Sequence, residues 1–65
     1  MAIITLTTDL GSKDFYQAAL KGSILSILPT ANIVDVTHEV PSFNISHAAF
    51  VLKNVYPYFP KGTVH

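Results

Sequence analysis

Two of the chain's four acidic residues, Asp9 and Asp14, lie in one short segment, TTDLGSKD, at residues 7–14. A β-branched run precedes this segment and a helical pattern follows it, so it predicts a strand-to-helix connection. In open parallel sheets, ligands bind beyond the carboxyl ends of the strands. A carboxylate there can accept hydrogen bonds from both hydroxyls of a ribose. Asp9 is therefore a candidate ribose ligand, and its alternative role is to shape the turn.

Asp14 lies where the helical pattern begins, and an anion at a helix N-terminus is stabilised by about 0.3–1 kcal/mol. It is a candidate ligand, or alternatively the N-cap residue, with Gln17 completing a pair similar to a capping box. The chain has neither a G-x-G-x-x-G motif nor a P-loop, which argues against a phosphate cradle.

The three histidines do not have the spacing of a metal site, and we expect no metal. His38 follows the second predicted strand and could line the same crevice as Asp9. Alternatively it is a loop histidine whose ring is satisfied by backbone groups. His47 is expected to face solvent from a helix.

Phe43 lies in the loop after the second predicted strand, on the expected ligand side. Its ring could stack on a base or cover a sugar. The alternative is a hydrophobic staple beside Asn44, the predicted cap of the second helix.

The hydrophobic pattern predicts a β-α-β-α order in which the first two strands are parallel and joined by a right-handed crossover. We thus expect the α/β fold class, with these residues forming the start of a mostly parallel sheet domain. The expected elements are a strand at 2–7, a helix from about 15 to 28 stopped by Pro29, a strand at 33–36, a helix from about 44 to 55, and the opening of a third strand at 63–65.

The composition is apolar for so short a chain, with 49% hydrophobic and 12% charged residues among 65. A domain of this size buries only about 60% of its unfolded surface, and the chain has no cysteine to form a disulfide. We therefore expect it to be part of a larger core. The formal net charge of zero gives no basic footprint for nucleic acid. The N-terminal residues lack the features of a signal peptide or a membrane span, so we expect a cytoplasmic protein with no membrane partner.

Four segments together resemble the N-terminal part of the S-adenosyl-L-methionine (SAM) hydroxide adenosyltransferases, the adenosine-forming SAM hydrolases related to fluorinase and chlorinase. The resemblance covers essentially the whole chain. Its segments are TTDLGSKD at 7–14, KGSILSILP at 21–29, IVDVTHEVP at 33–41 and YPYFPKGTVH at 56–65.

The resemblance implies an enzyme that cleaves SAM at the ribose C5′ with water, giving adenosine and methionine. SAM is the substrate, and no cofactor or metal is implied because the sulfonium is itself a good leaving group. The implied fold has an α/β N-terminal domain, of which residues 1–65 would be a part, and a C-terminal β-barrel domain that this chain lacks. Family members form trimers with SAM bound between subunits, so a homotrimer is expected of the full-length protein.

The resemblance also implies substrate-binding roles for individual residues. Asp9 matches the aspartate that holds the ribose hydroxyls. Asp14 matches an acidic residue at the methionine end of the pocket, and Phe15 and Tyr16 follow in the segment that lines that end, although the halogenases carry a smaller polar residue at Tyr16. Phe43 matches an aromatic residue that packs against the ligand.

No catalytic residue is expected within this segment. The family's hydrolases share an Asp–Arg–His set that handles the attacking water, and its aspartate would follow a few residues beyond His65. The chain also has no arginine, so we expect the 65 residues alone to be inactive. Two alternatives stay open: the parent protein is a SAM-dependent halogenase, or the chain is a non-catalytic assembly module.

Overall fold

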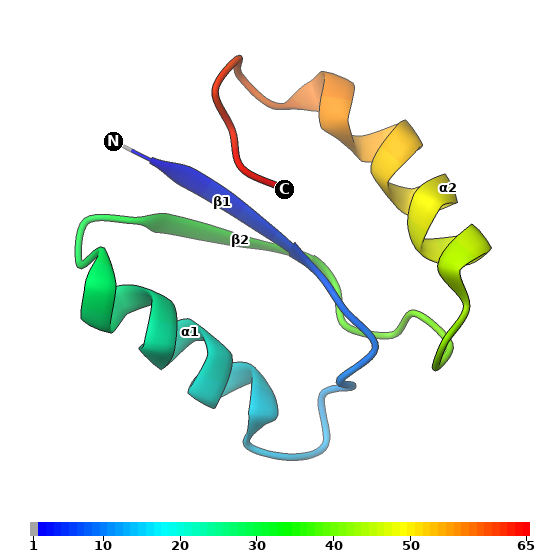
Figure 1. Cartoon of the computed structure of the whole chain (residues 1–65), viewed down its shortest axis with the longest axis horizontal. Helices are drawn as coiled ribbons and strands as arrows, with labels where there is room; N and C mark the ends of the chain where they lie inside the picture. The colour runs from blue at the N-terminus through cyan, green and yellow to red at the C-terminus, as the bar shows by residue number, and fades with distance from the viewer. Residues whose placement is uncertain (1) are drawn as a thin grey trace.

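The computed structural model describes residues 2–65 and has the predicted α/β architecture. Strand β1 (Ile3–Thr7) pairs in parallel with β2 (Asn32–Thr37), and helix α1 (Tyr16–Ile27) makes the crossover between them. Helix α2 (Ile45–Val55) follows β2 and continues into a 3₁₀ turn, η1 (Tyr56–Tyr58). The two helices lie on opposite sides of the strand pair (Figure 1), and the described residues form a flat body of 31 × 30 × 13 Å.

The third predicted strand is present as a single parallel bridge between Ile4 and Val64. The Thr5 amide donates to the Val64 carbonyl at 2.8 Å, and the Val64 amide donates to the Ile3 carbonyl at 3.0 Å. β1 therefore has β2 on one edge and residue 64 on the other. This central position explains why its sequence is a β-branched apolar run.

The pairing of β1 with β2 changes register at the carboxyl end. Leu6 lies opposite Asp35, but Thr7 lies opposite Thr37, which leaves Val36 as the extra residue of a bulge. Bulges re-aim side chains and are frequent next to functional sites. Here the bulge brings Thr37 and the loop after it alongside the loop after β1.

Helix α1 begins at Tyr16, so the N-cap position falls on Phe15 instead of the predicted Asp14. Phe15 is the N-cap residue and no side chain caps the helix, so the prediction that Asp14 caps it was wrong. Asp14 Oδ1 accepts from the Phe15 amide at 2.8 Å, one residue too early to reach the free amides of the first turn. Gln17 does not complete a capping box, because its Nε2 donates to the Gly11 carbonyl at 2.7 Å.

Helix α2 is capped as predicted, since Asn44 Oδ1 accepts from the His47 amide at 2.9 Å. We expect Asn44→Ala to lower the free energy of unfolding by about 1 kcal/mol, because it leaves that amide without its acceptor. Denaturant unfolding followed by circular dichroism measures the change. Asn44→Asp keeps the acceptor and serves as the matched control; an equal loss in both variants would contradict a capping role.

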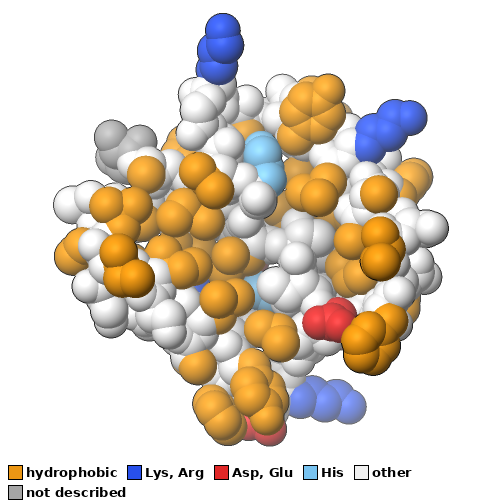
Figure 2. Space-filling model, viewed as in Figure 1, with side chains coloured by type: hydrophobic (Ala, Val, Ile, Leu, Met, Phe, Trp, Pro, Cys, Tyr) orange, Lys and Arg blue, Asp and Glu red, His pale blue; other side chains and the backbone are white. Residues whose placement is uncertain are grey.

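The described residues bury little apolar surface of their own. Leu6 and Val40 are the buried hydrophobic side chains among residues 2–65, whereas Ile27, Ile45 and Tyr58 are each more than 80% exposed. Hydrophobic side chains gather over the middle of the face shown in Figure 2. Large exposed apolar side chains of this kind leave surface that a partner segment or chain can cover.

No helix within residues 2–65 is long and apolar enough to cross a membrane.

Candidate functional site

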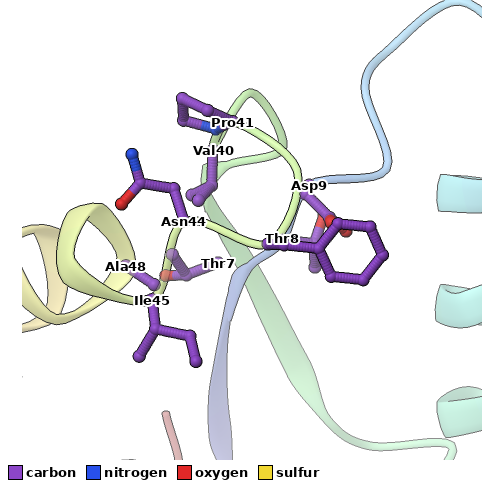
Figure 3. A pocket seen from close by; sticks show the side chains of 9 residues that line it. Thr7, Thr8, Asp9, Val40, Pro41, Asn44, Ile45 and Ala48 are labelled. Carbon is purple, nitrogen blue, oxygen red and sulfur yellow. The ribbon is translucent and has the colours of Figure 1, made fainter.

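A pocket of about 220 Å³ lies at the carboxyl end of β1, where the sequence predicts a ligand. Three chain segments build it: the end of β1 with the two residues after it, the loop after β2, and the first turns of α2 (Figure 3). The lining residues are Thr7, Thr8, Asp9, Val40, Pro41, Phe43, Asn44, Ile45 and Ala48.

Asp9 supplies the only charge of this pocket lining. Its side chain is exposed and makes no hydrogen bond or ion pair among residues 2–65. The neighbouring backbone, in contrast, is held on both sides: the Thr8 amide donates to the Thr37 carbonyl at 2.9 Å, and the Gly11 amide donates to the His38 carbonyl at 2.6 Å. A free carboxylate on a fixed backbone is suited to accept two hydrogen bonds from a ligand.

Gly11 makes this backbone path possible. Its φ of +72° lies in the left-handed region, which a glycine adopts without a steric cost. The turn at Gly11 keeps the loop against the β2 side, where Val40 also donates its amide to the Thr8 carbonyl at 3.1 Å. The two loops thus form one hydrogen-bonded edge that carries Asp9.

Phe43, in the loop after β2, also lines the pocket and is 96% exposed. The alternative reading, a hydrophobic staple beside the Asn44 cap, is wrong because a stapled ring would be packed against α2. Its φ of +60° is in the left-handed region, which is unusual for a bulky residue and costs about 1–2 kcal/mol. Backbone strain of this kind is concentrated at ligand sites.

Asp14, Phe15 and Tyr16 do not line this pocket. They precede or open α1, and the rings of Phe15 and Tyr16 stack on each other with centroids 4.7 Å apart. Both rings are more than half exposed. These three residues form a separate part of the loop surface, outside the pocket lining. Their roles at the methionine end of a substrate stay predictions.

His38 is not a pocket residue, and its ring is satisfied by side chains rather than by the backbone groups considered above. It is buried, with Nδ1 2.7 Å from Thr8 Oγ1 and Nε2 2.7 Å from Asp35 Oδ1. Lys21, on α1, forms an ion pair with the other oxygen of Asp35. His47 is exposed on α2, as expected.

The pocket residues that sequence reasoning missed are mainly apolar or hydroxyl-bearing, such as Thr7, Thr8 and Ile45. Among residues 2–65, Thr7 Oγ1 is buried without a hydrogen-bond partner. A buried unpaired hydroxyl costs about 1–3 kcal/mol, so it marks a place where a further polar group belongs. The two threonines directly before Asp9 were a usable signal, because they lie at the carboxyl end of a parallel strand, where ligands bind.

Hydrogen bonding lowers the pKa of the Asp35 carboxyl below its usual value of 3.8, mainly through Lys21 and secondly through His38. A depressed pKa in the folded state means that the stabilisation is present above about pH 4 and is lost as the pH falls through the folded value. The effect is modest, below about 1 kcal/mol, because the side chain is 39% exposed and solvent screens the pair.

We therefore expect Asp35→Asn to flatten the dependence of unfolding free energy on pH below about pH 4. Thermal unfolding at a series of pH values measures this slope. Glu39→Gln is the matched control because it removes an exposed acid that is outside this ion pair. If Asp35→Asn kept the wild-type slope, Asp35 would not be stabilised by its partners.

Comparison with known proteins identifies the family of this fold and pocket. The SAM hydroxide adenosyltransferase N-terminal domain matches residues 4–65. The chain belongs to this family. The match includes both loops of the pocket and α2, so Asp9 and Phe43 lie within the family's shared domain.

Several curated relatives carry the same domain. A protein of Methanocaldococcus jannaschii named (R)-S-adenosyl-L-methionine hydrolase is 52% identical over 62 residues, covering 89% of this chain and 24% of the relative. A protein of the same name from Salinispora arenicola is 42% identical, covering 88% of this chain and 22% of the relative. A fluorinase of an Actinoplanes species is 39% identical, covering 95% of this chain and 21% of the relative. The chain thus spans less than a quarter of the length of these SAM hydroxide adenosyltransferase relatives.

Proposed function

We propose that these residues form the nucleoside side of the substrate pocket of a SAM hydrolase, an enzyme that cleaves S-adenosyl-L-methionine with water. The free carboxylate of Asp9 at the edge of the parallel strands carries this proposal, because it can accept both ribose hydroxyls. The hydrolase names of relatives up to 52% identical support the same reaction.

The size of the pocket fits a partial site. Sites for drug-sized ligands enclose about 300–1,000 Å³, whereas this pocket has about 220 Å³. Asp9 would hold the ribose, and the Phe43 ring would cover the sugar or base. Asp14, Phe15 and Tyr16 would face the methionine end of SAM, where the Asp14 charge suits an α-ammonium group.

In the proposed reaction, a water oxygen bonds to the ribose C5′ as the C5′–sulfur bond breaks. The bonding electron pair moves to the sulfonium and neutralises it, so methionine leaves without a metal or cofactor, and the water gives up a proton. Fixing the ribose positions C5′ for this displacement, and such positioning is a large part of catalysis. The groups that handle the attacking water are not assigned to this segment.

The proposal is tested by product analysis of the full-length protein that carries these residues, incubated with SAM. We expect adenosine and methionine in equal amounts, and the same products when chloride or fluoride is added. A 5′-halogenated deoxyadenosine would instead assign a halogenase, and no cleavage would support the non-catalytic assembly module.

We propose a homotrimer in the cytoplasm as the working form of the full-length protein. The exposed side chains of Ile27, Ile45 and Tyr58 support assembly, because they leave apolar surface to be covered. Sedimentation equilibrium would show a species of three protomers, whereas a stable monomer would contradict this part of the proposal.

A further inference from the structure

We infer that the buried His38 is a positioning residue for Asp9, acting through a chain of hydrogen bonds that runs from Lys21 to the loop after β1. This inference rests on the proposed function, since it concerns how the carboxylate that would bind a ribose is held. It concerns groups outside the pocket lining.

The chain of contacts crosses four segments of the fold. Lys21 on α1 pairs with Asp35 on β2, and Asp35 Oδ1 lies 2.7 Å from His38 Nε2. His38 Nδ1 lies 2.7 Å from Thr8 Oγ1, and the Leu10 amide donates to the same Thr8 oxygen at 3.2 Å. The two ends of this path are a helix anchored by a charge and the residues on either side of Asp9.

One arrangement of protons satisfies every partner. With the imidazole proton on Nε2, His38 donates to Asp35, and its Nδ1 accepts from the Thr8 hydroxyl. That hydroxyl oxygen is then free to accept the Leu10 amide. Both functions of the Thr8 hydroxyl are used, which fixes its rotamer and therefore the backbone that leads into Asp9.

Because His38 is buried, its hydrogen bond to Thr8 matters more than an exposed one would. Its 6% exposure means that a lost hydrogen bond is not replaced by bulk water. The His38 main chain reinforces the side chain, because its carbonyl accepts the Gly11 amide at 2.6 Å. Asp9 lies between Thr8 and Leu10, and it has no side-chain hydrogen bond among residues 2–65 that could hold its carboxylate instead.

Two substitutions of His38 test its two hydrogen bonds separately, one at Nδ1 and one at Nε2. Asn at position 38 places its amide near the position of Nδ1 and keeps a partner for Thr8 but loses Asp35. Gln places its amide near the position of Nε2 and keeps Asp35 but loses Thr8. Both remove the imidazole from the same buried place, so a general loss of packing affects them alike.

The test compares the affinity of the full-length protein for adenosine and for 2′,3′-dideoxyadenosine, by calorimetry. We expect the wild type to bind adenosine about 100-fold more tightly, because 2′,3′-dideoxyadenosine lacks both hydroxyls that Asp9 would accept. His38→Gln should reduce this ratio to near one, whereas His38→Asn should keep most of it. A merely structural role would weaken both ligands equally and leave the ratio unchanged.

The outcomes distinguish the two proposals. A wild type that binds both nucleosides equally would overturn the ribose role of Asp9. A wild type that discriminates, with equal ratios in the two variants, would overturn the positioning role of His38 alone. Imidazole ¹⁵N spectra of the wild type give an independent check that needs no variant: the neutral ring should carry its proton on Nε2, and a proton on Nδ1 would contradict the proposed chain.

Discussion

Replacing Asp9 with alanine is expected to abolish most of the adenosine release from SAM by the full-length protein and to weaken adenosine binding about 100-fold. The carboxylate is the only charged group of the pocket lining, and it has no hydrogen-bond partner among residues 2–65. Hydrogen bonds to a charged group contribute about 1.5–3 kcal/mol, and 1.4 kcal/mol is a factor of ten in affinity. Adenosine release followed by chromatography, together with calorimetric binding, measures both effects.

Two further variants show whether the Asp9 effect is specific. Asp9→Asn keeps the shape but replaces one acceptor oxygen with a donor, so it should bind adenosine nearly as poorly as the alanine variant. Glu39→Gln neutralises a nearby exposed acid while its amide oxygen can still accept from Ser12, as the Glu39 carboxylate does. Adenosine binding should be kept in Glu39→Gln, and unchanged activity in Asp9→Ala would refute the ribose role.

Phe43→Gly is expected to change stability and binding in opposite directions. The ring is 96% exposed and contributes little burial, while its φ of +60° is a conformation that glycine adopts freely. The free energy of unfolding should therefore stay level or rise by up to about 1 kcal/mol, because relief of strain is partly offset by the greater entropy of the unfolded chain. Adenosine affinity should fall about tenfold or more, since aromatic stacking on a base contributes about 1–3 kcal/mol.

Denaturant unfolding and calorimetry on the same preparations test this pair of effects. Phe43→Trp is the matched control because it keeps an aromatic face at the same backbone position, and it should retain adenosine binding. A glycine variant that is less stable but binds normally would reverse the interpretation: the ring would then have a packing role rather than a ligand role.

Much of the fold could be predicted from the local pattern of hydrophobic and capping residues. The β-branched run at 2–7 and the apolar spacing of 45–55 predicted a strand and a helix that the structure contains. The Asn44 cap was also predictable, because capping depends on residues three positions apart. The Asp14 cap was not, since the turn continues through Phe15 before the helix begins.

The sequence predicted the position of Asp9 in the site but fewer of the residues around it. A carboxylate directly after a parallel strand predicts a ligand contact, and Asp9 does lie in a pocket at that edge. Sequence spacing could not show that Asp14 lies outside the lining of that pocket. It also could not tell that the exposed Phe43 ring leaves α2 unstapled, because that depends on a backbone angle at one residue.

The order of the elements, the parallel crossover and the family follow from local periodicity and from motifs in chain order, so they could be predicted without a structure. Tertiary structure alone decided which side chains meet. The bulge at Val36 turns the end of β2, so that His38 lies between Asp35 and Thr8, a residue 30 positions earlier. That contact depends on strand register and on two loops folding against each other, and a one-residue change in register would have separated the ring from the hydroxyl that leads to Asp9.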